Sequence, residues 1–156
     1  CYASIKGILF SKDLTTIVKV PIGNKLKNFS IPEGTTIIGS NAFSGCSSLQ
    51  SIDIPNSVKA IGDKVFSGCS SLQNIDIPSS VTTIRYGAFS NCLSLKSIHL
   101  HWAQLGCIQI DEYAFDVYNI VNLEECTLYV PSGTRWEYRH HPVLGKFKNI
   151  EIEKQE

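Results

Sequence analysis

Residues 31–53 read IPEGTTIIGSNAFSGCSSLQSID, residues 54–76 read IPNSVKAIGDKVFSGCSSLQNID, and residues 77–99 read IPSSVTTIRYGAFSNCLSLKSIH. The first two segments agree at 14 of 23 positions and share an unbroken FSGCSSLQ. Apolar residues recur at the same positions in each copy, but no single helical or strand period fits all of them. The pattern therefore indicates copies of one unit, each of which makes a full turn of the chain.

A fixed period of about 20–29 residues is typical of leucine-rich-repeat solenoids. Leu72, Ile75 and Ile77 match the LxxLxL form of a repeat strand. Strand alternation then directs Ile75 and Ile77 inward and Asn74 and Asp76 outward, and residues 81–84 read as a second extended segment on the opposite side. We predict a β-rich solenoid, a right-handed coil of short strands and turns with about five to six coils.

Two inward columns follow from the period. One is an aromatic spine, which contains Phe43, Phe66, Phe89 and Phe115. The other contains Cys46, Cys69 and Cys92, spaced by about 4.8 Å if their strands are neighbours. A bridge between two of them would need particular Cβ directions, and we expect reduced, inward thiols instead. Cys1, Cys107 and Cys126 follow no pattern, so cysteine usage does not indicate the compartment.

We expect one domain over residues 1–156. Residues 1–30 are interpreted as an N-terminal hairpin or atypical repeat, residues 31–99 as three regular repeats, residues 100–126 as an irregular repeat, and residues 127–156 as a C-terminal cap. Gly39 and Gly62 suit corners with positive φ. In the cap, Ser132 or Thr134 is expected to start a short helix that runs to about Arg139, and a last strand follows within residues 147–152. The residues expected to cover the final coil are Trp136, Leu144 and Phe147.

Composition excludes some partners. The chain has 14 basic and 14 acidic residues, so it lacks the basic field typical of nucleic-acid binding. No apolar stretch approaches the ~18 residues of a membrane-spanning helix, and the N-terminus lacks a signal peptide. Because the sequence starts abruptly, we expect a piece of a longer protein. Alternatively, Cys1 is the lipid-bearing residue of a processed lipoprotein.

The motif in residues 54–78, of the form IPxSVxxIGxxAFSGCSSLxxIxIP, resembles the BspA-like branch of leucine-rich repeats. The segments GILFSKDLTTIVKVP and TLYVPSGT…FKNI are similar to the N-terminal and C-terminal closures of that family. The resemblance implies a secreted or surface protein, extracellular or on the cell surface, of the kind linked to adhesion to host matrix proteins, host cells or other microbes. The chain departs from the family pattern at residues 100–107, LHWAQLGC.

The candidate binding surface is the outward side of the main strands, because repeat proteins commonly bind through such an extended face. Its residues recur with the repeat: Gln50, Ser51 and Asp53, then Gln73, Asn74 and Asp76, then Lys96, Ser97 and His99. The alternative interpretation is an ordinary solvated side of a sheet. Both interpretations require exposure, so exposure alone does not separate them.

Other sites are weaker. Asp53 and Asp76 would lie about 5 Å apart and could bind calcium or perturb each other's titration, but a solvated pair is the simpler interpretation. His99 and His101 share a strand face without a third ligand, so no metal site, catalytic residue or cofactor is predicted. The aromatics Trp102, Tyr113, Tyr118 and Trp136 either pack in the cap or form a sugar- or protein-binding patch.

The sequence therefore favours a non-enzymatic binding or adhesion module for a protein or glycan ligand, such as a host matrix or cell-surface protein. The alternative is a structural spacer or display domain of a larger secreted protein, and a hydrolase is a third hypothesis. No nucleic-acid partner and no membrane span are expected. The sequence does not indicate an oligomeric state.

Overall fold

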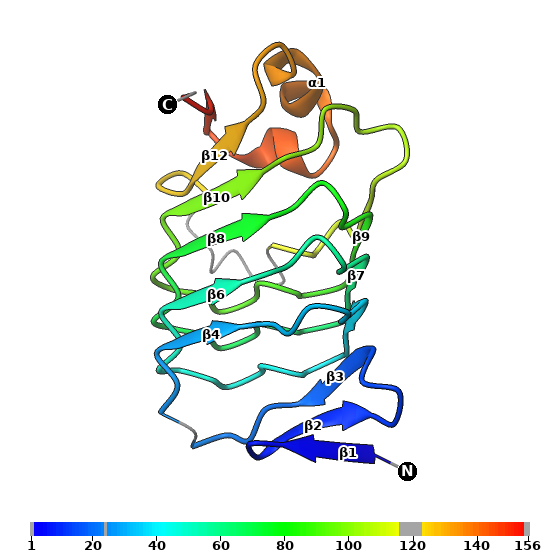
Figure 1. The fold of residues 1–156 in the computed structure, drawn as a ribbon. Coiled ribbons are helices and arrows are strands. Elements are labelled where there is room, and N and C mark those ends of the chain that lie inside the picture. The colour runs from blue at the N-terminus through cyan, green and yellow to red at the C-terminus, as the bar shows by residue number, and fades with distance from the viewer. Residues whose placement is uncertain (1, 24, 116–122, 155–156) are drawn as a thin grey trace.

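The chain winds into a stack of coils with a wall of strands on each of two sides (Figure 1). The structure is a computed structural model that describes residues 2–23, 25–115 and 123–154. One wall contains the longer strands β4 (Asn28–Ser30), β6 (Ser51–Asp53), β8 (Asn74–Ile77), β10 (Ser97–Leu100), β12 (Thr127–Val130) and β13 (Asn149–Ile152). All pairings within this wall are parallel. The solenoid with a 23-residue period is therefore confirmed, with about six coils.

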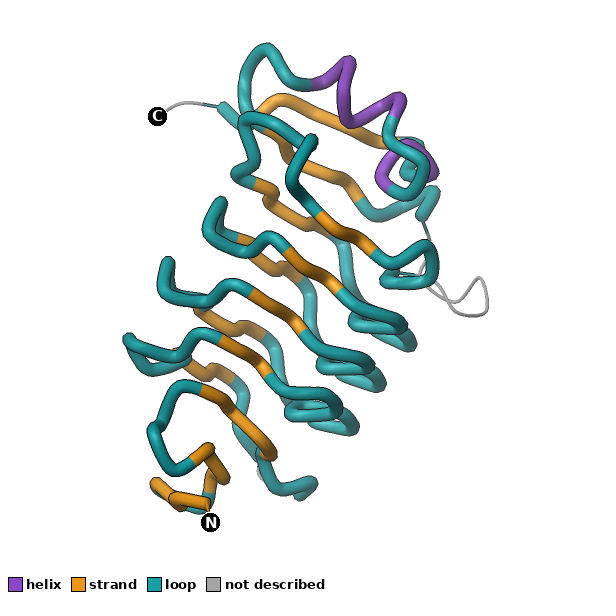
Figure 2. Tube along the Cα trace, turned by 90° about the vertical axis from the view of Figure 1, so that its right-hand side faces the viewer, coloured by secondary structure: helices purple, strands orange, loops and turns teal. Residues whose placement is uncertain are grey.

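The second wall is built from shorter strands and is continued by an antiparallel hairpin. It contains β1 (Tyr2–Ile5), β2 (Ile8–Ser11), β3 (Thr16–Lys19), β5 (Ile37–Ile38), β7 (Ala60–Ile61), β9 (Thr83–Ile84) and β11 (Gln109–Ile110). β1, β2 and β3 pair antiparallel, and the later strands pair in parallel, one from each coil. Figure 2 shows the strands of successive coils stacked over one another.

Proline marks the end of most long strands. Pro32, Pro55, Pro78 and Pro131 occupy the same place in four coils, where the missing amide donor helps to end the strand. The turns that follow use two left-handed positions in each repeat: Asn41, Lys64 and Gly87 at one, and Gly45, Gly68 and Asn91 at the other. Glycine and asparagine tolerate this conformation best, which explains why they dominate these positions.

The interpretation of Gly39 and Gly62 as corners with positive φ was wrong, because neither residue has a positive φ. Glycine is needed there for space. A Cβ on Gly39 would lie 2.7 Å from the carbonyl oxygen of Ile17, and a Cβ on Gly62 would lie 2.8 Å from the amide nitrogen of Ser40. The close approach of one coil to the next therefore selects glycine at these positions.

The aromatic spine runs through the centre of the stack, as predicted. Phe43, Phe66 and Phe89 stack with ring centroids 5.6 and 5.4 Å apart, and Phe89 stacks on Phe115 at 5.2 Å. Phe29 extends the spine at one end and Phe147 at the other. The two terminal rings are tilted or edge-on to their neighbours, so the column continues into both ends of the fold.

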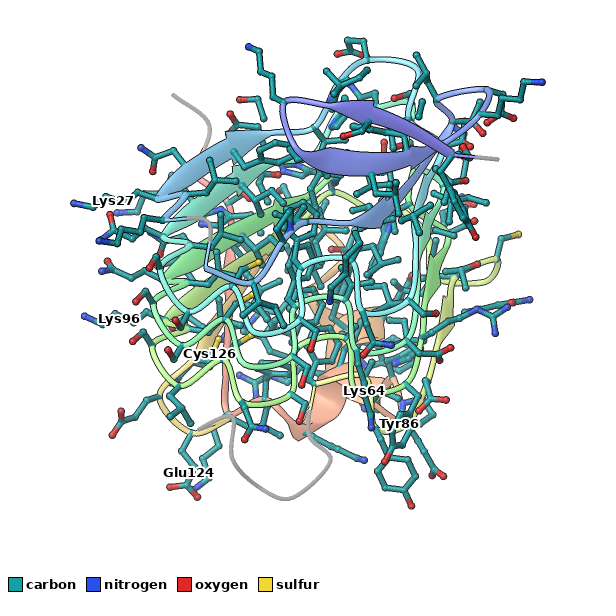
Figure 3. All side chains as sticks on the ribbon, turned by 90° about the horizontal axis from the view of Figure 1, so that it is seen from below. Lys27, Lys64, Tyr86, Lys96, Glu124 and Cys126 are labelled. Atoms are coloured by element: carbon teal, nitrogen blue, oxygen red, sulfur yellow. The ribbon has the colours of Figure 1, made fainter. Side chains whose placement is uncertain are left out.

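The cysteines of the repeat line a second inward column, and their thiols are free and buried. Cys126 joins them beside Cys92, although its sequence position follows no pattern. Figure 3 shows Cys126 inside the ribbon, with Lys27 and Lys96 projecting from the long-strand side. Burial raises the pKa of the Cys92 and Cys126 thiols to about 12, so both are protonated at neutral pH.

The C-terminal cap contains α1 (Arg135–His140) and a 3₁₀ turn, η1 (Leu144–Lys146). Thr134 precedes the helix as expected, but its hydroxyl donates to the carbonyl oxygen of Pro131 at 2.7 Å and caps no amide. Leu144 and Phe147 are buried over the last coil, as predicted. The prediction that Trp136 is also buried there was wrong, since Trp136 is 71% exposed.

Tyr138 takes the covering role that the sequence assigned to Trp136. Its hydroxyl donates to the carbonyl oxygen of Trp102 at 2.9 Å, and the Trp102 indole N–H donates to the carbonyl oxygen of Val81 at 2.7 Å. Trp102 is buried, so the departure from the repeat at residues 100–107 supplies the anchor for the cap. Cys1 and Tyr118 lie outside the described residues.

No helix in the described part of the chain is long and apolar enough to cross a membrane.

Candidate functional site

The outward side of the long strands, which we call the long-strand face, carries two polar columns. Strand register and the repeat period together place Asn28, Ser51, Asn74, Ser97, Thr127 and Asn149 in the first column. The second column contains Ser30, Asp53, Asp76, His99, Tyr129 and Glu151. Their neighbours along the strands, such as Ile52 and Ile75, are buried, so alternation alone directs the polar side chains outward.

Hydrogen bonds between neighbouring coils hold several of these side chains. The Ser51 hydroxyl donates to Asn28 Oδ1 at 2.8 Å. Two repeats later in the chain, the Ser97 hydroxyl donates to Asn74 Oδ1 at 2.7 Å. Ser30 donates to Asp53 Oδ2 at 2.7 Å. Because Ser51 and Ser97 are used as donors and the asparagine oxygens as acceptors, the asparagine amide hydrogens remain available to a ligand.

The long-strand face is interrupted between β6 and β8, which belong to separate sheets. The amide of Gln73 lies 3.4 Å from the carbonyl oxygen of Gln50, whereas the equivalent hydrogen bonds of Gln50 and Lys96 measure 2.7 and 2.8 Å. A hollow of about 420 Å³ spans this interruption and β10, and its lining residues are Ser51, Ile52, Asp53, Asn74, Ile75, Asp76, Ser97 and His99.

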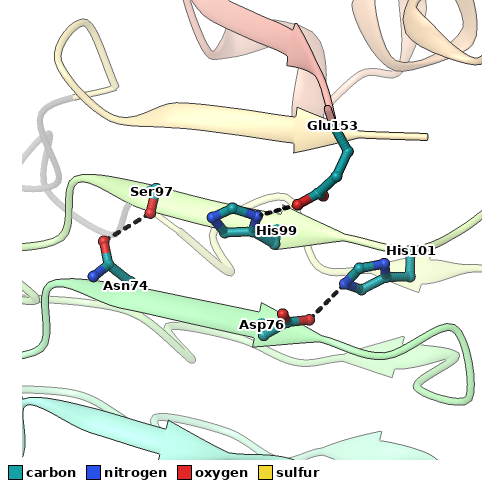
Figure 4. Close-up of polar contacts among 6 residues, drawn as sticks. All are labelled: Asn74, Asp76, Ser97, His99, His101 and Glu153. Carbon is teal, nitrogen blue, oxygen red and sulfur yellow. Dashed lines mark hydrogen bonds and ion pairs between the residues drawn. The ribbon is translucent and has the colours of Figure 1, made fainter. Parts of the chain in front are cut away.

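Two histidines are paired with carboxylates on this face (Figure 4). His99 Nδ1 lies 2.8 Å from Glu153 Oε1, and the His99 ring stacks on Tyr129 with centroids 4.6 Å apart. His101 Nε2 lies 2.6 Å from Asp76 Oδ1. Asp76 lines the first hollow and also a second one of about 440 Å³. The second hollow is lined by Ile54, Asn56, Asp76, Pro78, Ser79 and His101.

The hollow brings together six of the nine residues that the sequence singled out: Ser51, Asp53, Asn74, Asp76, Ser97 and His99. Gln50, Gln73 and Lys96 are exposed just before the strands. Asp53 and Asp76 bind different partners, Ser30 and His101. Among the residues that the structure describes, no group of three or more His, Cys, Asp or Glu side chains could hold a metal ion.

Sequence reasoning missed Glu153, Tyr129 and the pairing role of His101. Glu153 and Tyr129 lie beyond the regular repeats, so the period does not reach them. His101 had a usable signal, because it occupies the place where the other coils have Pro32, Pro55 and Pro78. Its amide donates to the carbonyl oxygen of Ile77 at 3.3 Å, which a proline could not do.

A separate hollow of about 540 Å³ lies between the short strands and the cap. Ile84, Ile108 and Ile110 contribute apolar lining, and His141 contributes from the cap. The Nδ1 atom of His141 accepts the amides of Val143 and Leu144, and burial lowers the pKa of this imidazole.

A stack of repeat coils with one exposed face of long parallel strands defines the leucine-rich-repeat class. The family model for the BspA type leucine-rich repeat region matches residues 21–131 in six copies. The chain belongs to this family, and the resemblance inferred from its motifs is confirmed.

Solved bacterial structures share the fold. A leucine-rich cell surface protein from Faecalibacterium prausnitzii A2-165 is 28% identical, with a TM-score of 0.72, and the match covers 99% of this chain and 40% of that one. A leucine-rich repeat protein from Bacteroides capillosus is 19% identical, with a TM-score of 0.62 over 98% of this chain and 99% of that one. The pneumococcal vaccine antigen PcpA is 20% identical, with a TM-score of 0.61, and the match covers 99% of this chain and 48% of that one.

The chain spans less than half the length of the Faecalibacterium protein and of PcpA. No curated protein matches it. Proteins with this fold are typically interaction modules and not enzymes.

Proposed function

We propose that the chain is a non-enzymatic binding module that presents its long-strand face to a protein or glycan ligand at the cell surface. The observation that carries the proposal is the hollow over the interruption between β6 and β8, which is lined by side chains from three successive coils. A ligand that lies across it would contact residues that are far apart in sequence but fixed relative to one another by the stacked coils.

The polar side chains of this face are partly ordered before any ligand arrives. Hydrogen bonds orient Ser51, Asp53 and Asn74, and both a carboxylate and an aromatic ring hold His99. Ordering side chains opposes association by about 0.5–1.5 kcal/mol for each flexible group, so prior order favours binding. A surface location is supported by the related cell surface protein of Faecalibacterium.

The test begins with a screen of the chain against immobilised extracellular-matrix proteins and a glycan array. Each ligand found is then measured against a variant that combines Asp53→Asn, Asp76→Asn and His99→Gln. We expect at least tenfold weaker binding, because the three changes remove two carboxylates and an imidazole from the hollow but keep side chains of similar size. Asp53 and Asp76 are exposed, and exposed substitutions usually alter stability by less than about 0.5 kcal/mol each. Because His99 is partly buried and contacts Glu153 and Tyr129, the thermal unfolding midpoint of the triple variant is measured together with its binding.

The matched control combines Lys59→Ala, Thr82→Ala and Gln109→Ala. These three residues are exposed, occupy successive coils and lie on the short-strand side, so their replacement should leave binding unchanged. Equal binding by both triple variants would show that the ligand uses another surface. A chain that binds nothing in either screen would contradict the proposal and favour the spacer function.

A further inference from the structure

Trp136 is exposed on the surface of the cap, whereas Trp102 and Tyr138 are buried beneath it. The hydroxyl and indole hydrogen bonds of these two residues hold the cap without any contribution from Trp136. An isolated exposed apolar residue needs no explanation. The Trp136 side chain, however, is held in one arrangement by His140, and Arg135 and Arg139 lie on one side of it along the helix surface, with Glu137 on the other.

The outward face of α1 is ordered by contacts within the helix. The Trp136 indole stacks on the His140 ring, with centroids 4.2 Å apart and an interplanar angle of 28°. His140 Nδ1 also lies 2.7 Å from the carbonyl oxygen of Trp136. Because successive helical residues are about 100° apart, Trp136 and His140 lie on the side opposite the buried Tyr138. One face of the indole is thus covered by His140, and the other is open to solvent.

Two arginines, Arg135 and Arg139, occupy the part of the helix surface next to this aromatic pair. On the helical wheel Arg139 lies about 60° from Trp136, and Arg135 lies beyond it. Arg135 makes only a long, exposed contact of 3.9 Å with Glu151, and Arg139 donates through Nη1 to the carbonyl oxygen of Lys148 at 3.4 Å. Most of their N–H groups therefore remain available. Lys148 is paired with Glu124, so the positive charge that this surface offers to an anionic ligand comes from Arg135 and Arg139.

We propose that this face of α1 is a second binding surface, which takes an acidic saccharide. The ring C–H groups of the sugar pack flat on the open indole face, and its carboxylate or sulfate group is bound by the guanidinium groups of Arg135 and Arg139. Arginine pairs with such planar or tetrahedral oxyanions through two N–H groups at once. A single flat, pre-oriented aromatic face suits a pyranose ring better than an acidic peptide, because the peptide would bind through its charges alone.

The experiment measures dissociation constants for four probes of similar length: a heparin oligosaccharide, an oligogalacturonate, a neutral dextran oligosaccharide and poly-L-glutamate. We expect both acidic oligosaccharides to bind, with dextran and poly-L-glutamate at least tenfold weaker. Trp136→Ala should weaken the acidic saccharides about tenfold or more, as expected for truncation of a tryptophan anchor. Arg139→Gln should weaken them and flatten the salt dependence.

Leu93→Ala is the matched control, because Leu93 is 64% exposed and belongs to the regular repeat at residues 77–99, not to α1. It should bind as the wild type does. The triple variant of the long-strand face should also bind the acidic saccharides normally, which separates this surface from the first. Unchanged binding by Trp136→Ala, equal binding of poly-L-glutamate, equal binding of dextran, or no binding of either acidic saccharide would each overturn the proposal.

Discussion

Cys69 and Cys92 show how the same position of the repeat can both pack in the core and form a hydrogen bond there. The Cys69 thiol donates to the carbonyl oxygen of Phe43 at 3.3 Å, and the Cys92 thiol donates to that of Phe66 at 3.2 Å. Each of these carbonyl groups also accepts an amide from its own coil. The thiol therefore links one coil to the previous one at the carbonyl group of a spine phenylalanine.

Thiol reactivity tests this role. Burial raises the pKa of the thiols of Cys46, Cys69, Cys92 and Cys126, and only the thiolate is a good nucleophile. Among the described cysteines Cys107 alone is exposed. We expect a maleimide to label Cys107 in the native protein and to reach the other four only after unfolding. Mass spectrometry of the peptides gives the answer, and rapid native labelling of Cys69 or Cys92 would refute the inward ladder.

Individual residues differed in how well the sequence predicted them. Phe66 and Cys69 were placed correctly, because their column follows from the period alone. The prediction that Trp136 covers the final coil was wrong, and Tyr138 is buried there instead, because a helix as short as α1 gives no periodic signal for its inward side. Gly62 was interpreted as a corner with positive φ, which it does not have. The space left by the neighbouring coil explains the glycine at Gly62, and a local backbone pattern does not show that contact.

Among the elements, the long strands were predictable and the joints between them were not. The alternation of apolar and polar residues specified the outward columns of β6, β8 and β10. The interruption between β6 and β8 coincides with a longer hydrogen bond between Gln73 and Gln50, and the nearly identical repeats give no sign of it. The pairing of His99 with Glu153 joins β10 to the segment after β13, 54 residues away. A long-range contact of this kind has no sequence signature.

His141, in the connection between α1 and η1, makes the stability of the fold depend on pH, and the direction of the effect can be worked out. Burial lowers the pKa of His141, so the folded state favours the neutral imidazole that accepts the amides of Val143 and Leu144. The unfolded chain takes up the proton at a higher pH. Stability is therefore complete above the ordinary histidine pKa of about 6.5 and declines as the pH falls through the lowered value.

His141→Asn should reduce this acid sensitivity, because the asparagine oxygen can still accept the two amides but does not titrate. The measurement is the thermal unfolding midpoint of both proteins between about pH 8 and pH 5. The two curves should run parallel above about pH 7 and separate below it, with the wild type falling faster. Identical slopes across the range would show that His141 does not contribute.

The stacked coils unite the two proposed surfaces. No coil can bury its apolar face alone, so neighbouring coils and the cap complete one another's core. The spine from Phe29 to Phe147 passes through every coil and into the cap. The long-strand face and the outward face of α1 therefore depend on the same core, although they share no side chain.

Replacement of Phe66 at the centre of the spine tests this shared core most directly. The comparison is made in a Trp136→Phe background, in which buried Trp102 is the sole indole. Phe66→Ala should lower the free energy of unfolding by about 3–5 kcal/mol, and Phe66→Leu by less. Circular dichroism and Trp102 fluorescence should report the same denaturation midpoint. A near-neutral Phe66→Ala variant, or a Trp102 transition that keeps its wild-type midpoint, would contradict a core shared by all coils.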